Sequence, residues 1–520
     1  MVVWTVSTLL STAARYLEGH GSSSPRLDAE LLLAEVLQED RLALYVDHDR
    51  PLAEAEVAGF RELIRRRAHA EPVAYILGRA YFRYQQLKVT PAVLIPRPET
   101  EELVDRAFEW LDIHPLELCV EPGGTGGPDV PCGGTPLVAD VGVGSGAIAL
   151  SLAAERGLSV LGVEADAEAL GVARDNRARL GLEKAVELRQ GDLLRGIPPG
   201  SLRLVVSNPP YVSDEEMPAL APEVRDHEPR AALRGGPDGL TVIRRLLPQA
   251  LKALSPGGRL LLEVGAVQAR AVVSLGLEVG FCCPDIFLDL SGRERMVGLS
   301  RPGAPWVAAE DAVDSTRLDT LRRALRAGAI VGIPTDTVYG LACTWDSNRG
   351  VRRLLAAKGR GAAKPVAVLF SSTSAVRTCL PDLPAAVLTV LDEFLPGPFT
   401  FVVPTTVSRP ELVGTEDSVG VRVPDAPDLL GFLDRLGLPL AATSANHAGQ
   451  PDAAGPADVP RDLAAACAIL VISGRGEGAV GTPSTVVDLR TLARDGRWQV
   501  LREGAVAADA LALRMERLGY

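Results

Sequence analysis

Aromatic residues are scarce in this chain. They make up 4% of its 520 residues, so leucine, valine and alanine must fill the hydrophobic cores. A secretion signal is also missing, because Met1 to Leu17 has no basic start and carries a polar residue every few positions. No stretch approaches the roughly 18 apolar residues that a membrane-spanning helix needs. We therefore expect a soluble, cytoplasmic protein that does not contact membranes.

Metal-binding patterns are absent as well. The seven cysteines show no C-x-x-C spacing and are odd in number, which favours reduced, packed thiols over metal ligands. The six histidines are scattered without metal-ligand spacing. We therefore predict no resident metal site.

A large basic face is not expected, because the formal net charge is −12. This argues against a protein that coats nucleic acid, although a local basic cleft remains compatible with it. The composition, 47% hydrophobic and 23% charged, is typical of globular proteins. The length predicts two or three domains.

The order of sequence patterns predicts a multidomain α/β protein. Residues 1–78 carry apolar residues at helical spacing and indicate a helical domain. Over 79–300, apolar runs alternate with helical patterns, which is typical of a Rossmann-like domain with a mainly parallel sheet. A Gly/Pro-rich insertion lies at about 114–136. Another break indicates a linker at 301–315, and residues 316–520 then read as a second α/β domain.

Short apolar runs mark the expected strands of the two α/β domains. They are Leu137–Val141, Val160–Val163, Leu202–Ser207, Arg259–Val264, Ala329–Ile333, Pro365–Phe370, Phe399–Val403, Val419–Val423 and Ser484–Asp488.

A glycine-rich segment, Asp140–Ala149, ends one of these strands and opens a helix. Its glycines let the backbone approach a cofactor, and the helix N-terminus favours electron-rich groups. Glu164, at the end of the next strand, can hold ribose hydroxyls. Gly142, Gly144 and Ala147 also satisfy the G-x-G-x-x-G/A pattern of dinucleotide binders, so this loop alone leaves the cofactor open.

The motif Asn208-Pro209-Pro210-Tyr211 resolves that ambiguity. An amide nitrogen is a poor nucleophile because its lone pair is delocalised. The Asn208 side-chain oxygen and the Pro209 carbonyl can accept both of its N–H bonds, which holds the nitrogen in line with a sulfonium methyl group. Tyr211 can pack over the planar substrate. The two motifs together predict methylation of such a nitrogen by S-adenosylmethionine.

Residues 1–300 resemble the HemK-type family, which methylates the glutamine of the Gly-Gly-Gln loop in peptide-chain release factors. The matching stretches are 71–78, 94–100, 140–149, 208–211 and 223–230. The resemblance implies that the N-terminal helices dock the release factor and that Asn208, Pro209, Pro210 and Tyr211 receive the glutamine. The cofactor residues that it implies are Gly142, Val143, Gly144, Ser145, Gly146, Glu164, Leu193 and Asn208.

A rival interpretation is an amino-methyltransferase for nucleic-acid bases, because that class also uses N-P-P-Y. Such enzymes usually carry a basic recognition domain, whereas the flanking sequence here is helical and nearly balanced in charge.

The second α/β region carries its own set of polar groups. Thr335 and Thr337 follow a predicted strand, at the edge where ligands bind in open α/β sheets. Lys358, Arg360 and Lys364 lie within seven residues at a helix end, and such a density of cations suits a triphosphate. No G-x-x-x-x-G-K-[ST] run occurs, so a P-loop is excluded as the nucleotide site.

Over residues 318–506 this set resembles the YrdC-like threonylcarbamoyl-adenylate synthases. Their Lys-x-Arg and Ser-x-Asn signatures stand here as Lys358/Arg360 and Ser444/Asn446. The resemblance implies a twisted open α/β fold that forms a threonine carbamate from bicarbonate and adenylates it with ATP, accompanied by Mg²⁺. Lys358 and Arg360 are implied to stabilise phosphate charge. The implied ligand contacts are Thr337, Arg422, Ala442 and Ser484 for threonine and Arg360, Lys364, Ser418, Ser444 and Arg502 for ATP.

A domain of this type that only binds RNA is the alternative. We expect no stable nucleic-acid binding, and we expect the product to pass to the machinery that transfers threonylcarbamoyl to tRNA. The Pro/Gly break at 301–305 further predicts that the two halves fold and act independently.

Overall fold

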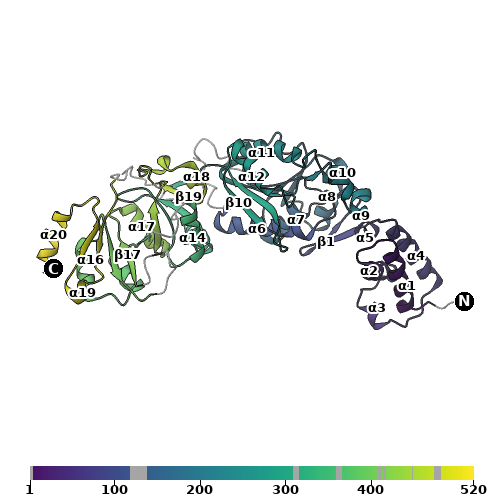
Figure 1. The fold of residues 1–520 in the computed structure, drawn as a ribbon, viewed down its shortest axis with the longest axis horizontal. Helices are drawn as coiled ribbons and strands as arrows, with labels where there is room; N and C mark the ends of the chain where they lie inside the picture. The colour runs from purple at the N-terminus through teal and green to yellow at the C-terminus, as the bar shows by residue number, and fades with distance from the viewer. Residues whose placement is uncertain are drawn as a thin grey trace.

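The computed structural model describes residues 4–116, 137–308, 315–358, 366–407, 413, 417–447, 449–472 and 482–520. Figure 1 shows three bodies arranged in an arc, with the N-terminal helices at one end and α20 (Ala508–Arg517) at the other. Along the chain these bodies are a helical unit, a central α/β unit and a second α/β unit. None of the described helices is both long and apolar enough to cross a membrane.

The helical unit consists of α1 Val6–Gly19, α2 Pro25–Leu37, α3 Ala43–Val46, α4 Glu54–Ala68 and α5 Val73–Leu77. Leu10, Leu33 and Phe60 pack in its buried core, as the apolar spacing predicts. Arg67 of α4 pairs with buried Asp28 at 2.6 Å and with Glu223 at 2.8 Å. Because Glu223 belongs to the central unit, in α9 (Pro222–His227), this triad joins the two units.

The central unit is built on a seven-stranded sheet in the order β10-β11-β9-β6-β3-β4-β5. Helices α6 and α7 pack on one face, and α11 and α12 on the other. The strands are β3 Val138–Val141, β4 Val160–Glu164, β5 Val186–Gln190, β6 Leu202–Ser207, β9 Leu254–Glu263, β10 Cys282–Leu288 and β11 Glu294–Ser300. Its principal helices are α6 Pro98–Ile113, α7 Ala147–Arg156, α8 Ala167–Arg179, α11 Thr241–Ala253 and α12 Ala269–Val279.

Smaller elements complete the central unit. They are β1 Arg79–Phe82 and β2 Gln85–Lys88, which form a hairpin, β7 Val212–Ser213 and β8 Arg234–Gly236, which pair with each other, and α10 Arg230–Leu233. In the large sheet β3 pairs in parallel with both β4 and β6, so the strand order reverses there. Ligands of open α/β sheets bind at the carboxyl edge of such a reversal.

The second α/β unit contains a ten-stranded mixed sheet in the order β12-β19-β13-β14-β18-β15-β17-β16-β20-β21. Helices α14 and α16 pack with one core and α13 and α17 with the other. The strands are β12 Trp306–Ala308, β13 Ile330–Ile333, β14 Gly340–Thr344, β15 Ala367–Leu369, β16 Phe399–Pro404, β17 Ser418–Arg422, β18 Leu440–Ser444, β19 Cys467–Ile472, β20 Thr485–Asp488 and β21 Gln499–Arg502. The helices before α20 are α13 Ser315–Ala327, α14 Asn348–Ala357, α15 Thr373–Cys379, α16 Ala385–Phe394, α17 Pro427–Leu436, α18 Arg461–Ala465 and α19 Leu492–Asp495.

The two α/β units pack against each other. Ile113 at the end of α6 joins the core that contains Leu321 of α13. The Gly303 amide donates to the Arg461 carbonyl at 2.8 Å, and the Cys283 thiol donates to the Asp462 carbonyl at 3.2 Å. Part of the predicted linker, Trp306–Ala308, forms β12 and pairs in parallel with β19. The chain between the units is therefore partly built into the second sheet.

Candidate active sites

The glycine loop after β3 lines a cavity of about 280 Å³ at the carboxyl edge of the central sheet. Gly142 and Gly144 adopt φ of 78° and 54°, a region that costs other residues strain. Glu164, which ends β4, accepts a hydrogen bond from the Gly144 amide at 2.9 Å. The opposite wall includes Leu193. Glycine loop, carboxylate and apolar wall thus meet around one space.

This cavity offers a ligand an open loop backbone, a carboxylate and an apolar side chain. A Cβ atom built on Gly142 would meet no other atom within 4 Å, so the loop backbone faces open space. Val143, Ser145 and Asn208 also line it. Gly146, also predicted to bind the cofactor, is not among the residues that line the cavity, and a Cβ there would lie 2.7 Å from Leu150. It permits the tight start of α7 instead.

Asn208 is oriented by a chain of buried hydrogen bonds. Its Nδ2 donates to Thr100 Oγ1 at 3.0 Å, and the Thr100 hydroxyl donates to Glu263 Oε2 at 2.7 Å. Thr100 and Glu263 are both buried, and burial raises the pKa of the Glu263 carboxyl. Because Nδ2 is used in this way, the Asn208 side-chain oxygen is presented as an acceptor; no described residue donates to it.

The same carboxylate holds Tyr211. The Tyr211 hydroxyl donates to Glu263 Oε1 at 3.2 Å and accepts from Arg295 at 3.0 Å, and the Arg295 guanidinium lies 5.3 Å from the ring centroid. Burial raises the pKa of Tyr211 to about 12, so the phenol keeps its proton. Gln268 donates to the Tyr211 carbonyl at 2.9 Å and fixes the backbone of the motif.

Of the predicted glutamine site, Asn208 and Pro210 line the cavity, and Pro209 and Tyr211 lie beside them along the chain. Thr100, Glu263 and Arg295 were not among the predicted site residues. Thr100 lies in the 94–100 stretch that carries part of the family resemblance, which was the one available signal. Glu263 ends a strand far along the chain, and no local pattern marks it.

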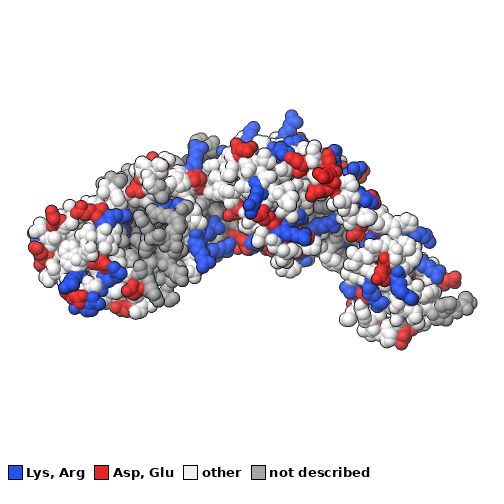
Figure 2. All heavy atoms as spheres, viewed as in Figure 1, with Lys and Arg blue, Asp and Glu red and all other residues white. Residues whose placement is uncertain are grey.

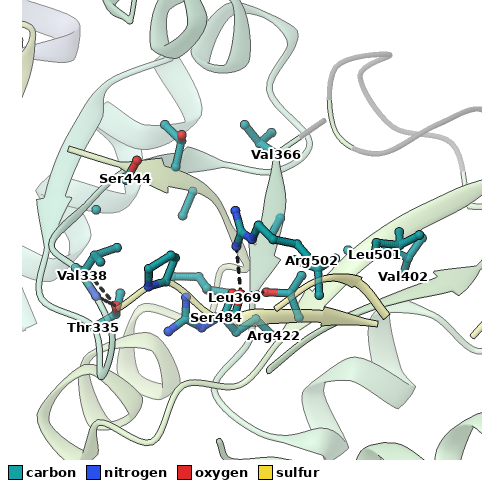
Figure 3. Close-up of a pocket in the computed structure, with 18 of the residues that line it drawn as sticks. Thr335, Val338, Val366, Leu369, Val402, Arg422, Ser444, Ser484, Leu501 and Arg502 are labelled. Atoms are coloured by element: carbon teal, nitrogen blue, oxygen red, sulfur yellow. Dashed lines mark hydrogen bonds between the residues drawn. The ribbon is translucent and has the colours of Figure 1, made fainter. Parts of the chain in front are cut away.

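The second site is a cavity of about 540 Å³ in the C-terminal sheet. The predicted residues Ser418, Arg422, Ala442, Ser444, Asn446, Ser484 and Arg502 all line it. Figure 3 shows Arg422, Ser484 and Arg502 close together, with Ser444 on another wall. Arg502 donates to the Ser484 carbonyl at 2.9 Å. The fold therefore gathers residues from five separate strands and loops into one cavity.

Arg422 is held by a buried carboxylate. Its guanidinium donates to Asp336 through a short contact and to Thr337 Oγ1 at 2.6 Å. Both charged side chains are about nine-tenths buried. Arg422 Nε and Asp336 Oδ2 are buried without a hydrogen-bond partner among the described residues. The pair therefore retains one donor and one acceptor without a partner among the described residues.

Lys358, which is predicted to stabilise phosphate charge, contacts the Ser-x-Asn loop. It is buried, and its ammonium donates to the carbonyl of Ser444 at 2.6 Å, to the carbonyl of Asn446 and to Asn446 Oδ1 at 2.8 Å. All three of these acceptors belong to the Ser-x-Asn loop. In this structure Lys358 positions the Ser-x-Asn loop. Arg360 and Lys364 lie outside the described residues.

No group of three or more His, Cys, Asp or Glu side chains that could hold a metal occurs within the described ranges. The cysteines described, at positions 282, 283, 343, 379 and 467, are free thiols.

The fold and the two cavities define a methyltransferase unit joined to a second, separate α/β unit. Family profiles agree with this division. The PrmC N-terminal domain matches residues 8–78, the methyltransferase small domain matches 134–227, and the Sua5/YciO/YrdC family, described as telomere recombination, matches 323–504.

Relatives specify the first unit further. A release factor glutamine methyltransferase of Geobacter sulfurreducens is 39% identical over 297 residues, 57% of this chain and 96% of the relative. One from Caulobacter vibrioides is 40% identical over 294 residues, which cover 56% of this chain and 95% of that relative. The chain belongs to the release factor glutamine methyltransferase family, and it carries a Sua5/YrdC domain fused behind that part.

Among solved structures, P. abyssi Sua5 in complex with L-threonine is 29% identical with a TM-score of 0.34. The match covers 38% of this chain and 57% of that one, so this chain spans little more than half of that protein.

Proposed function

We propose that this chain is a bifunctional enzyme. Its first activity methylates the side-chain amide nitrogen of the glutamine in the Gly-Gly-Gln motif of release factors. Its second activity forms L-threonylcarbamoyladenylate from threonine, bicarbonate and ATP. We propose in addition that residues 1–78 dock the release factor, that 79–300 carry methyl transfer, and that 316–520 carry adenylate formation.

The orientation of Asn208 is the observation that supports methyl transfer. With Nδ2 bound to Thr100, the side-chain oxygen can accept one N–H of the substrate amide, and the Pro209 carbonyl can accept the other. Both bonds together orient the nitrogen and favour the geometry of the transition state. S-adenosylmethionine supplies the methyl group when bound. No strong base is required, because the amide proton becomes acidic as the nitrogen is alkylated.

Residues around the glycine loop are proposed to hold that cofactor. Gly142, Val143, Gly144 and Ser145 offer backbone contacts, Glu164 offers a carboxylate for the ribose hydroxyls, and Leu193 offers an apolar wall for the base. The Glu164 carboxylate also accepts from the Ala165 and Asp166 amides at 2.9 and 3.1 Å, so its direction is fixed before any ligand arrives.

The buried Arg422–Asp336 pair is the observation that supports the second activity. Arg422 is proposed to bind the threonine carboxylate, with Thr337 and Ser484 beside it. In the proposed reaction the threonine nitrogen forms a carbamate with bicarbonate and releases water. A carbamate oxygen then displaces pyrophosphate from the α-phosphate of ATP. Arg360, Lys364, Ser418 and Ser444 are proposed to bind the triphosphate with its Mg²⁺.

One assay tests both activities on the same preparation. The purified chain is incubated with labelled S-adenosylmethionine and a mixture of a release factor and nucleic acid, and in parallel with ATP, threonine and bicarbonate. We expect label on the release factor and pyrophosphate that depends on both threonine and bicarbonate. Label on nucleic acid instead would favour base methylation, and the absence of such pyrophosphate would favour an RNA-binding role for the second unit.

A further inference from the structure

A third cavity, of about 460 Å³, lies between the methyltransferase unit and the Sua5/YrdC unit, away from both candidate active sites. Arg106 of α6 and Arg259 of β9 line it from one side, and Arg349 and Arg353 of α14 line it from the other. Figure 2 shows basic side chains gathered where α14 meets the central unit. Four guanidinium groups around one cavity are costly unless other groups compensate their charge.

The carboxylates of the cavity do not compensate all four. Glu109 pairs with Arg106 at 2.9 Å and lies 3.9 Å from Arg349. Asp285 pairs with Arg259 through a short contact, and the third acid, Asp462, pairs with His447 at 3.0 Å.

Arg353 remains without an ion pair or hydrogen bond to any residue that the structure describes, and its Nε is buried. Burial, with Arg349 and Arg259 nearby, lowers the pKa of Arg353.

Two further side chains in the wall have polar atoms without a partner. Arg259 is 4% exposed, and its Nε has no hydrogen-bond partner among the described residues. His114 is 3% exposed and stacks on Trp110 with 4.6 Å between ring centroids, and no residue in the described part of the chain bonds to its Nε2. A buried polar atom without a partner is costly. Both atoms therefore indicate that a polar ligand belongs in this cavity.

His114 further restricts the chemistry of that ligand. Its Nδ1 lies 3.2 Å from the Trp110 carbonyl, which can only accept, so Nδ1 carries the ring proton. Burial and the neighbouring arginines lower the pKa of His114 well below its ordinary value, so the ring is neutral. Nε2 then holds a lone pair and needs a donor. The arginines need anionic acceptors, and the histidine needs an O–H on the same ligand.

We propose that this cavity is a binding site for a phosphate group that keeps one proton, held between the two enzyme units. The anionic oxygens of the group bind Arg353 and Arg259, and its P–OH donates to His114 Nε2. Sulfate has the same shape and charge but no proton at neutral pH. Because α14 belongs to one unit and β9 to the other, the bound group ties the two units together.

Isothermal titration of the full chain at pH 7.5, in low salt, tests this with inorganic phosphate, sulfate and AMP as separate probes. AMP distinguishes a nucleotide phosphate from the free ion. We expect inorganic phosphate, which keeps one proton at this pH, to bind at least about tenfold more tightly than sulfate, the scale of leaving a buried acceptor without its donor. AMP, whose phosphate monoester has a second pKa of about 6 and is mostly without a proton here, should bind no more tightly than sulfate. Sulfate binding as tightly as phosphate would overturn the proposed role of His114.

The variant Arg353→Gln should weaken phosphate-group binding by at least about tenfold, because it removes the uncompensated charge. Arg352→Gln is the matched control, since Arg352 is the exposed neighbour on the same helix. Phosphate should raise the melting temperature of the unmodified chain and of the Arg352 variant, but not of the Arg353 variant. Pyrophosphate formation, the proposed activity of the unit that contains α14, should be unchanged in both variants, which checks their folding. Equal binding by the two variants would overturn the proposal.

His114→Phe keeps a ring to stack on Trp110 and removes the lone pair. It should bring the affinities for phosphate and sulfate to within about threefold of each other, mainly by weakening phosphate. An unchanged preference for phosphate over sulfate would show that a group other than His114 accepts the P–OH hydrogen bond, and would contradict the site as described.

Discussion

At the scale of single residues, the methyltransferase site depends on groups that stand behind the motif. Thr100 stands in the cavity wall and Glu263 lies behind it, and their hydrogen bonds to Asn208 and Tyr211 decide which atom of the Asn208 amide faces a substrate. The site therefore has an inner layer of ligand contacts and an outer layer that orients it.

Asn208→Ala should reduce methyl transfer to a release factor by roughly a hundredfold or more, the scale of losing one oriented polar group in a site. Thr100→Val should reduce kcat by a smaller factor, about tenfold, with KM for S-adenosylmethionine little changed, because the amide remains but loses its anchor. Pyrophosphate formation should be normal in both. Full methylation by the Asn208 variant would contradict the assignment.

The role of Arg422 is best tested with a single and a double variant, because removing Arg422 leaves the buried Asp336 carboxylate without its partner. Arg422→Ala alone should raise the threonine requirement by roughly thirtyfold or more, from a loss of about 2–5 kcal/mol. It should also destabilise the fold, since Asp336 is left buried without its partner. Adding Asp336→Asn should restore the melting temperature without restoring threonine affinity. If the double variant recovers threonine use, Arg422 has a structural role only. Affinity for ATP is the control, and it should change little in both.

Asp140 should make the stability of the methyltransferase unit depend on pH. It is 1% exposed, and burial raises the pKa of its carboxyl from its ordinary 3.8 to about 7. Between about pH 4 and pH 7 the folded chain therefore binds a proton more readily than the unfolded chain, so stability is lost as pH rises through this window.

Asp140→Asn, which keeps an acceptor for the Ala149 amide, should remove that loss. Compared with the unmodified chain, its free energy of unfolding should rise from pH 4 to about pH 7 and then level off in denaturant titrations. The same substitution at exposed Asp175 serves as the reference. A difference that does not vary with pH would mean that Asp140 is ionised in the folded state.

At the scale of elements, the glycine loop divides its glycines between two roles. Gly142 and Gly146 share a positive φ, 78° and 91°, so alanine incurs backbone strain at both. Their surroundings differ. A Cβ added at Gly146 would lie within 3 Å of the Leu150 side chain, whereas one added at Gly142 would meet no atom within 4 Å.

Gly146→Ala should therefore lower the melting temperature more than Gly142→Ala. Gly142→Ala should instead lose more affinity for S-adenosylhomocysteine than its stability loss explains. Calorimetric binding and thermal unfolding of the same two preparations check this. Equal binding losses in both variants would place the cofactor elsewhere.

Sequence patterns anticipated the elements whose boundaries glycine, proline and apolar runs mark. The runs at 202–207 and 399–403 coincide with β6 and β16 to within a residue. Strands β14 and β18, with sequences rich in alanine and threonine, were not predicted, because such stretches carry little strand signal. The hydrogen bond between Asn208 and Thr100 joins residues 108 positions apart, and the bond between Thr100 and Glu263 joins residues 163 positions apart. Such contacts depend on the sheet order, which one sequence does not reveal.

At the scale of the whole molecule, the packing between the units changes how they should be separated. The C-terminal unit begins before residue 310, because β12 covers the edge strand β19. A fragment of residues 301–520 should therefore remain soluble and form pyrophosphate, whereas 310–520 exposes β19 and should aggregate more. Light scattering and activity of the two fragments test this, with 1–300 expected to methylate by itself. Equal solubility of the two C-terminal fragments would make β12 dispensable.

The pairing of β12 with β19 also sets the order in which the two units can fold during synthesis on the ribosome. The methyltransferase unit is complete in sequence once about 300 residues have been made, and β12 follows almost at once. Its partner strand is synthesised about 160 residues later, roughly ten to thirty seconds at the usual speed of translation. Throughout that interval the first enzyme can already be folded while the second sheet cannot close. A nascent chain halted within that interval would carry the first enzyme without the joint that connects it to the second.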